Sequence, residues 1–139
     1  MVDIFLEYQG ELHCSAQHGP SGAVLATDAP VDNHGRGQSF SPTDLVATGL
    51  GSCMATVMGI LSQKRGYELS GTRVHVKKFM TQALPRRIAR LAVTVTAPAS
   101  ATQSVGDGRA DLEHEALHCP VRLSLLDAIE VPVSFDWQT

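Results

Sequence analysis

The stretch RGQSFSPTDLVATGLGSCMATVMGILSQKRG, residues 36–66, decides how the 139-residue chain folds around it. Ser41 is a good N-cap, Pro42 suits the first helical position, and Asp44 follows Ser41 by three residues, as in a capping box. The last turn is basic and is followed by a glycine, which is a natural C-cap. We therefore predict one long helix, residues 42–65.

Apolar side chains surround this helix almost completely, which predicts burial on most sides. Its most apolar part, residues 45–61, is a little short for a membrane span and contains several Gly, Ser and Thr residues. A buried helix in a protein that does not cross a membrane is the better interpretation.

The composition is that of one folded domain, residues 1–139. Hydrophobic residues make up 43% of the chain and charged residues 18%. The net charge is −3 and no basic run occurs, so we expect no nucleic-acid partner. The N-terminus does not resemble a signal peptide, and three cysteines do not make a disulfide framework, so we expect a cytoplasmic protein.

The remaining segments indicate a mixed fold. A broken helix is expected at 109–127, interrupted by Pro120, and a loop of small residues at 99–108. A turn is expected at Gln9 and Gly10. Alternating apolar residues predict six strands, at 2–8, 11–17, 23–27, 73–79, 88–97 and 129–137. The order predicts an α+β fold, with helices packed on antiparallel sheets.

Two cysteines lie in unusual places. Cys53 falls mid-helix among small residues, which leave room for a molecule to approach the sulfur. Cys119 directly precedes Pro120, where a helix break gives a thiol room to move. The alternative is that both are buried cysteines acting as small hydrophobic residues, the usual role of a free cysteine.

Two motifs carry a resemblance to a known family. Cys53 follows Pro42 by eleven residues, and Cys119-Pro120-Val121 precedes the last predicted strand. The stretch 36–66 resembles the core helix of the OsmC/Ohr family of organic hydroperoxide resistance proteins. The resemblance implies an OsmC-like fold over nearly the whole chain and an intertwined homodimer.

The resemblance also implies a reaction. Cys53, as thiolate, attacks an organic hydroperoxide, which leaves an alcohol and a sulfenic acid. Cys119 then forms the Cys53–Cys119 disulfide, and a small dithiol of the lipoyl type reduces it. Neither a cofactor nor a metal is implied. A nearby cation should favour the thiolate, and Arg36 matches the arginine that the family places in the loop before the helix.

One position departs from the family pattern. The family carboxylate directly follows the helix-start proline, where this chain has Thr43, and Asp44 comes one residue later, a rotation of about 100°. Roughly 13 Å of helix separates Asp44 from Cys53, so we expect Asp44 and Arg36 to act from the partner subunit. The departure leaves an alternative open, a non-peroxidatic OsmC-like dimer that binds a ligand or senses redox state.

A third interpretation comes from the sequence HEALH at 114–118. It matches H-E-x-x-H, in which histidines at i and i+4 on a helix bind zinc and the glutamate acts as a base. A catalytic zinc needs a third protein ligand, and only Asp127, Glu130 and Asp136 follow. The zinc hydrolase is therefore a remote alternative, and two exposed histidines on a solvated helix are the simpler interpretation.

Overall fold

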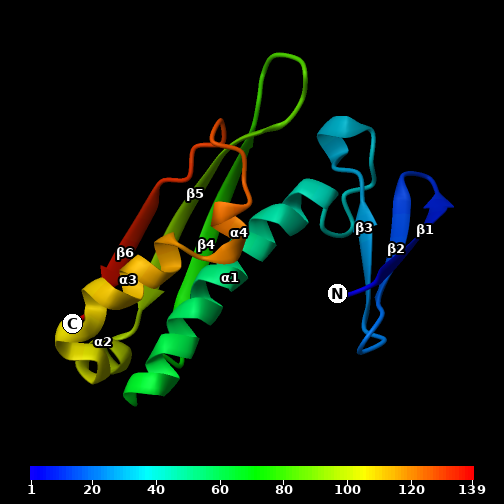
Figure 1. The fold of residues 1–139 in the computed structure, drawn as a ribbon. Coiled ribbons are helices and arrows are strands. Elements are labelled where there is room, and N and C mark those ends of the chain that lie inside the picture. Colours follow the sequence, from blue (N-terminus) through cyan, green and yellow to red (C-terminus); the bar gives the residue numbers. More distant parts are fainter. The chain divides into compact units, whose positions relative to one another are not determined.

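The chain forms two compact units in the computed structural model, which describes residues 1–139 (Figure 1). The first unit is Met1–Val46 and the second is Ala47–Thr139. Two three-stranded sheets and several helices make up the fold. The α+β fold class is therefore confirmed, while the assignment of residues 1–139 to a single domain stays a prediction.

The first unit is built on an antiparallel sheet in the order β1-β2-β3. Its strands are β1 (Ile4–Gly10), β2 (His13–His18) and β3 (Val24–Asp28), close to the three predicted ones. A short 3-10 helix, η1 (Val31–Asn33), lies in the loop that leads to the long helix.

The hairpin between β1 and β2 turns later than predicted. Glu11 and Leu12 form the turn, with φ of 51° and 60°, and Gly10 still pairs with His13. Two successive left-handed residues match the twist of a two-residue hairpin, although only glycine and asparagine adopt this conformation readily. The prediction of a turn at Gln9 and Gly10 was wrong because pairing with β2 takes precedence over the local preference of glycine.

The second unit begins within the long helix α1, which spans Pro42–Arg65 as predicted. The elements after it are β4 (Arg73–Met80), β5 (Ile88–Ala97), α2 (Ala99–Val105), η2 (Gly106–Gly108), α3 (Arg109–Leu117), α4 (Pro120–Leu123) and β6 (Val133–Trp137). Strand β5 is central, antiparallel to β4 and parallel to β6. Helix α1 lies across this sheet, with α3 beside it (Figure 1).

The core of the second unit lies between α1, β5 and α3. Helix α1 contributes buried residues spaced three or four apart, which places them on one face: Ala47, Leu50, Gly51, Met54, Met58 and Ser62. Alternate residues of β5 point at the helices and are buried: Leu91, Val93, Val95 and Ala97. Leu112 and Ala116 of α3 complete the core.

Helix α1 is less enclosed than predicted. By length and composition alone it could cross a membrane, but one face packs on the sheet. Its other side is partly open, and Ile60 is 49% exposed. The prediction of burial on most sides was wrong for the single chain, because the sheet covers only one face of the helix.

Two further predictions need correction. Residues 99–105 form α2, not a loop, because Ala101 and Val105 lie one turn apart and are both buried. The last strand begins at Val133 instead of residue 129, and it runs parallel to β5, so the second sheet is not purely antiparallel. The predicted break at Pro120 is confirmed, since α3 ends at Leu117 and α4 begins at Pro120.

The close packing of α1 on β4 gives the first testable prediction. A Cβ atom at Gly51 would lie 3.0 Å from Val76 Cγ2 and 3.3 Å from Val74 Cγ1. We expect Gly51→Val to lower the free energy of unfolding by about 1–3 kcal/mol, because the added carbons force the helix from the sheet. Chemical denaturation measures the change.

Gly59 provides the matched control on the same helix. A Cβ atom there would have nothing within 4 Å. We expect Gly59→Val to change the free energy of unfolding by less than about 0.5 kcal/mol, since valine has a better helix propensity than glycine. Equal destabilisation by the two substitutions would contradict the role given to the contact at Gly51.

Candidate active site

Two cysteines from distant segments of the sequence meet in the second unit. Cys53 lies in the middle of α1 and is half-buried, and Cys119 lies directly before α4 and is completely buried. Cys53 packs against the core cluster that contains Cys119, and it helps to raise the pKa of the Cys119 thiol. Neither is part of a disulfide. The structure thus brings together the two sulfurs whose proximity the sequence alone did not establish.

The backbone holds Cys119 in place on both sides. Its N–H donates to the Ala116 carbonyl at the end of α3, and its carbonyl accepts from the Leu123 N–H in α4. Its φ and ψ of −63° and 147° are extended, because the following proline excludes the helical conformation. The helix break at Pro120 therefore turns the Cys119 side chain into the core beside α1.

The environment keeps Cys119 protonated. Burial raises the pKa of its thiol above the ordinary value of 9.0, and the backbone amide of Arg122 acts against this effect. The hydrogen bond with Cys53 and the charge that Cys53 carries as thiolate raise the pKa further, and the amide of Val121 again opposes them. These effects together favour the protonated form of Cys119.

The small residues around Cys53 have separate roles. Gly49 lies one turn before Cys53, and a Cβ atom there would meet nothing within 4 Å. Because side chains of a helix lean towards its N-terminus, the missing side chain leaves open space beside the sulfur. Gly51 instead allows the close packing against Val74 and Val76. The expectation that all of these small residues give access to the sulfur is therefore wrong for Gly51, which serves packing.

The two charged residues singled out by sequence lie in the first unit. Arg36, in the loop before α1, is half exposed and forms an ion pair with Glu11 in the turn between β1 and β2. Asp44 and Ser41 form a capping box, in which the Ser41 N–H donates to Asp44 Oδ2 at 2.9 Å and the Asp44 N–H donates to Ser41 Oγ at 3.1 Å. Their catalytic roles stay predictions, and the cap gives Asp44 a structural role.

A buried polar cluster that no sequence pattern indicated shapes the Arg36 loop. Asp28, only 3% exposed, accepts hydrogen bonds from His13 Nδ1 at 2.6 Å and from the Gln38 N–H at 3.1 Å. The Ala29 N–H also donates to the Leu12 carbonyl, in the turn that carries Glu11. No local motif links these residues, because only the register of β2 and β3 places His13 opposite Asp28.

The H-E-x-x-H residues lie where the sequence placed them, on α3 and at its end. The His114 and His118 rings are neighbours, with centroids 4.1 Å apart. No group of three or more His, Cys, Asp and Glu side chains in the chain is arranged to hold a metal ion. The pair therefore lacks the third protein ligand that a catalytic zinc site needs, which is the physical objection to the zinc hydrolase.

The contact between the sulfurs predicts a thiol titration. In a Cys14→Ser protein, we expect Cys119 to titrate above the ordinary thiol range, and Cys53→Ala in that background should lower its pKa because the hydrogen bond and charge of Cys53 are lost. Some elevation should remain, since burial is the largest cause. Ultraviolet absorbance of the thiolate measures the titration.

The same shift has a consequence for stability. A thiol whose pKa is raised by folding contributes stability below its ordinary pKa, and this contribution is lost as the pH rises through the folded-state pKa.

The titration has a control on the same helix. Thr56→Ala, an exposed substitution one turn along α1 from Cys53, should leave the Cys119 titration unchanged. An unchanged titration in the Cys53→Ala protein would show that the two thiols do not interact.

The chain is similar to proteins of one known family. The family model of OsmC-like proteins matches residues 35–134. A crystal structure from Psychrobacter arcticus 273-4, described as a suspected osmotic stress induced and detoxification response protein, is 39% identical. The match covers 97% of this chain and 96% of the Psychrobacter chain, with a TM-score of 0.88. None of the curated proteins matches.

More distant structures show the same fold. An organic hydroperoxide resistance protein OsmC from Legionella pneumophila is 14% identical, with a TM-score of 0.71 over 98% of this chain and 96% of that chain. An OsmC-like protein from Mycoplasma pneumoniae is 11% identical, with a TM-score of 0.80 over 100% and 98% of the two chains. From the family match and the relative at 39% identity, the chain belongs to the OsmC-like family.

Proposed function

We propose that this protein is a two-cysteine thiol peroxidase that reduces organic hydroperoxides to alcohols. The observation that carries the proposal is the contact between Cys53 and Cys119, two free thiols from remote parts of the chain. Membership of a family that includes organic hydroperoxide resistance proteins supports it. The apolar surroundings of both sulfurs favour a hydroperoxide with an organic group over hydrogen peroxide.

The two thiols differ in a way that assigns their roles. Cys53 is partly exposed beside the open space at Gly49, so a hydroperoxide can reach it. Cys119 is buried and has a raised pKa, so it keeps its proton until the first step is complete. Cys53 is therefore the attacking cysteine and Cys119 the one that resolves the oxidised state.

The proposed reaction balances as two steps and a reduction. The Cys53 thiolate attacks the distal oxygen, the O–O bond breaks, and the alkoxide takes a proton and leaves as alcohol. Cys119 loses its proton and attacks the sulfur of the Cys53 sulfenic acid, so that the S–S bond forms and the hydroxyl leaves as water. An external dithiol, of the lipoyl type by family resemblance, returns two electrons and two protons to the disulfide.

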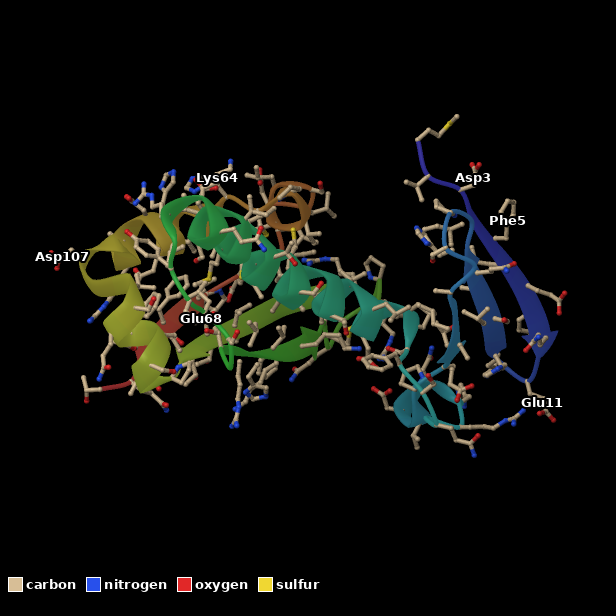
Figure 2. All side chains as sticks on the ribbon, turned by 90° about the horizontal axis from the view of Figure 1, so that it is seen from below. Asp3, Phe5, Glu11, Lys64, Glu68 and Asp107 are labelled. Atoms are coloured by element: carbon tan, nitrogen blue, oxygen red, sulfur yellow. The ribbon has the colours of Figure 1, made fainter.

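We propose in addition that the active form is an intertwined homodimer. The sheet of the first unit exposes large apolar side chains on both faces: Ile4 and Leu6 on one and Phe5 on the other are each more than 60% exposed. Figure 2 shows Phe5 projecting from its strand. A three-stranded sheet with neither face covered is marginal in water, so a partner subunit that covers it would stabilise the fold.

In this dimer we propose that Arg36 favours the thiolate form of Cys53 in the partner subunit, with Asp44 at the same interface. Glu11, paired with Arg36, supplies the carboxylate that would hold the guanidinium in place. Asp44 is already engaged in the capping box, so its contribution is to orient the start of α1.

The second candidate is a non-peroxidatic dimer that binds a ligand or senses redox state. Thr43 in place of the family carboxylate and the engagement of Asp44 in a cap favour it. An apolar hollow of about 180 Å³ between α1 and α3, lined by Val57, Ile60, Leu61, Lys64 and Glu115, is smaller than usual ligand pockets of roughly 300–1,000 Å³. A sensor would form the Cys53–Cys119 disulfide without turning over hydroperoxide in the presence of a dithiol.

Cysteine variants test the proposed reaction. With tert-butyl hydroperoxide and dihydrolipoamide, we expect Cys53→Ser to lose peroxide consumption to background. Cys119→Ser should consume about one equivalent and then stall, because the sulfenic acid cannot be resolved by a disulfide. Cys14→Ser is the control, since Cys14 lies in the first unit's sheet, and it should keep the wild-type rate.

Mass spectrometry of the oxidised wild-type protein gives an independent readout. We expect a Cys53–Cys119 disulfide, with Cys14 still reduced. Wild-type activity in the Cys53→Ser protein would refute the proposed nucleophile. A disulfide that forms while no multiple turnover occurs would favour the sensor.

A heterodimer tests the dimer and Arg36 together. One protomer carries Arg36→Gln and its partner carries Cys53→Ser, with two different affinity tags for purification. If Arg36 acts across the interface, one of two sites keeps both native residues, and the heterodimer should have about half of the wild-type rate. If Arg36 acts within its own chain, neither site is complete.

The two parent homodimers provide the reference rates, and Arg73→Gln, an exposed arginine on β4, is the control for charge alone. A heterodimer no more active than the better parent would contradict action across the interface. A wild-type rate in the Arg36→Gln homodimer would remove Arg36 from the site, and a monomer in analytical ultracentrifugation would remove the dimer.

A further inference from the structure

The end of α3 carries two histidines that the proposed peroxidase does not use. His114 and His118 are both exposed, and their spacing of four residues places them on the same side of the helix. Their ring centroids lie 4.1 Å apart, with the planes tilted by 31°. Two imidazoles are thus already gathered at one point of the surface.

A hydrogen bond fixes which nitrogen of His118 is available. His118 Nδ1 lies 2.7 Å from the backbone carbonyl oxygen of His114. A carbonyl only accepts hydrogen bonds, so in the neutral ring Nδ1 carries the proton and Nε2 keeps its lone pair. Histidines that bind metals commonly donate their other N–H to a backbone carbonyl in this way, which fixes the ring and the tautomer.

The geometry is close to that of a shared ligand pair. An ion bound by two imidazole nitrogens lies about 2.0–2.1 Å from each of them, which puts these nitrogens roughly 3 Å apart. The two ring centroids lie 4.1 Å apart, which is of the same order as this separation. Both rings are exposed, so water can supply the remaining ligands.

The charge of α3 favours a cation at this point. The helix carries three acidic residues, Asp111, Glu113 and Glu115, and one arginine, Arg109, and Asp111 is paired with Arg65 of α1. Its C-terminal end bears the negative end of the helix dipole, and Arg122 Nη1 donates to the Leu117 carbonyl there. The acidic residues and the dipole lower the energy of a divalent ion near His118.

We propose that His114 and His118 form a surface site for a divalent transition metal of the Cu²⁺, Ni²⁺ or Zn²⁺ class, with water completing the coordination. The site is distinct from a catalytic zinc centre, because no third protein ligand joins the pair. It is also independent of the peroxidase, because neither imidazole takes part in the proposed reaction.

Nickel is the best probe, because Cu²⁺ oxidises thiols and Zn²⁺ prefers thiolates more strongly. In calorimetry of the full-length protein with NiCl₂, we expect one equivalent to bind, with affinity at least about tenfold lower in His114→Ala and in His118→Ala. In NMR spectra, substoichiometric Ni²⁺ should broaden the His114 and His118 ring signals first.

Two controls separate this site from other donors. His75→Ala removes an exposed histidine on β4 and should leave the affinity unchanged, as should a Cys53→Ser/Cys119→Ser protein. Nickel binding that persists in the His114→Ala/His118→Ala protein, or that disappears with the two thiols, would overturn the proposal. Both alanine substitutions are on the surface, and circular dichroism verifies that the variants fold.

Discussion

The packing of α1 on the sheet β4-β5-β6 determines where the Cys53 sulfur can lie. The helix is held at one height above β4 because Gly51 has no side chain between it and Val74 and Val76. Cys53 is two residues further on and therefore points away from this tightest contact, towards the segment that contains Cys119. The reaction proposed for Cys53 and Cys119 therefore depends on how closely α1 packs on β4.

The two units contribute different physical features. In the second, an apolar core packs around two neighbouring cysteines, and burial raises the pKa of Cys119. In the first, hydrogen bonds to Asp28 order the loop that carries Arg36, and the hairpin turn supplies the carboxylate of Glu11. The charged groups thus lie in the first unit and the thiols in the second, as the proposed site between two subunits requires.

Much of the fold could be predicted from local signals. The cap at Ser41 and Asp44 and the glycine after Arg65 give both ends of α1, because those interactions lie within a few residues. Helix α2 was missed because its small residues have low hydrophobicity, and only the core formed by other elements reveals that Ala101 and Val105 are buried. The parallel pairing of β6 and the His13–Asp28 contact depend on long-range register, which no local pattern encodes.

The candidate site was predictable only in part. The family motif indicated both cysteines, but the contact between them depends on how the segment after α3 bends at Pro120. Glu11 gave no signal in the sequence, because an exposed glutamate in a turn is common. Its position opposite Arg36 results from the two left-handed residues of the hairpin, a geometry that the residue types there do not favour.

The parallel pairing of β6 with β5 also bears on the order in which the molecule matures. Parallel strands cannot be joined by a tight turn, so the long crossover segment between β5 and β6 must fold back along the sheet before the two strands pair. Such non-local closure is slow compared with helix formation. During synthesis α1 emerges before the segment that carries Cys119, so the Cys53 thiol lacks its neighbour until the C-terminal part of the chain has folded.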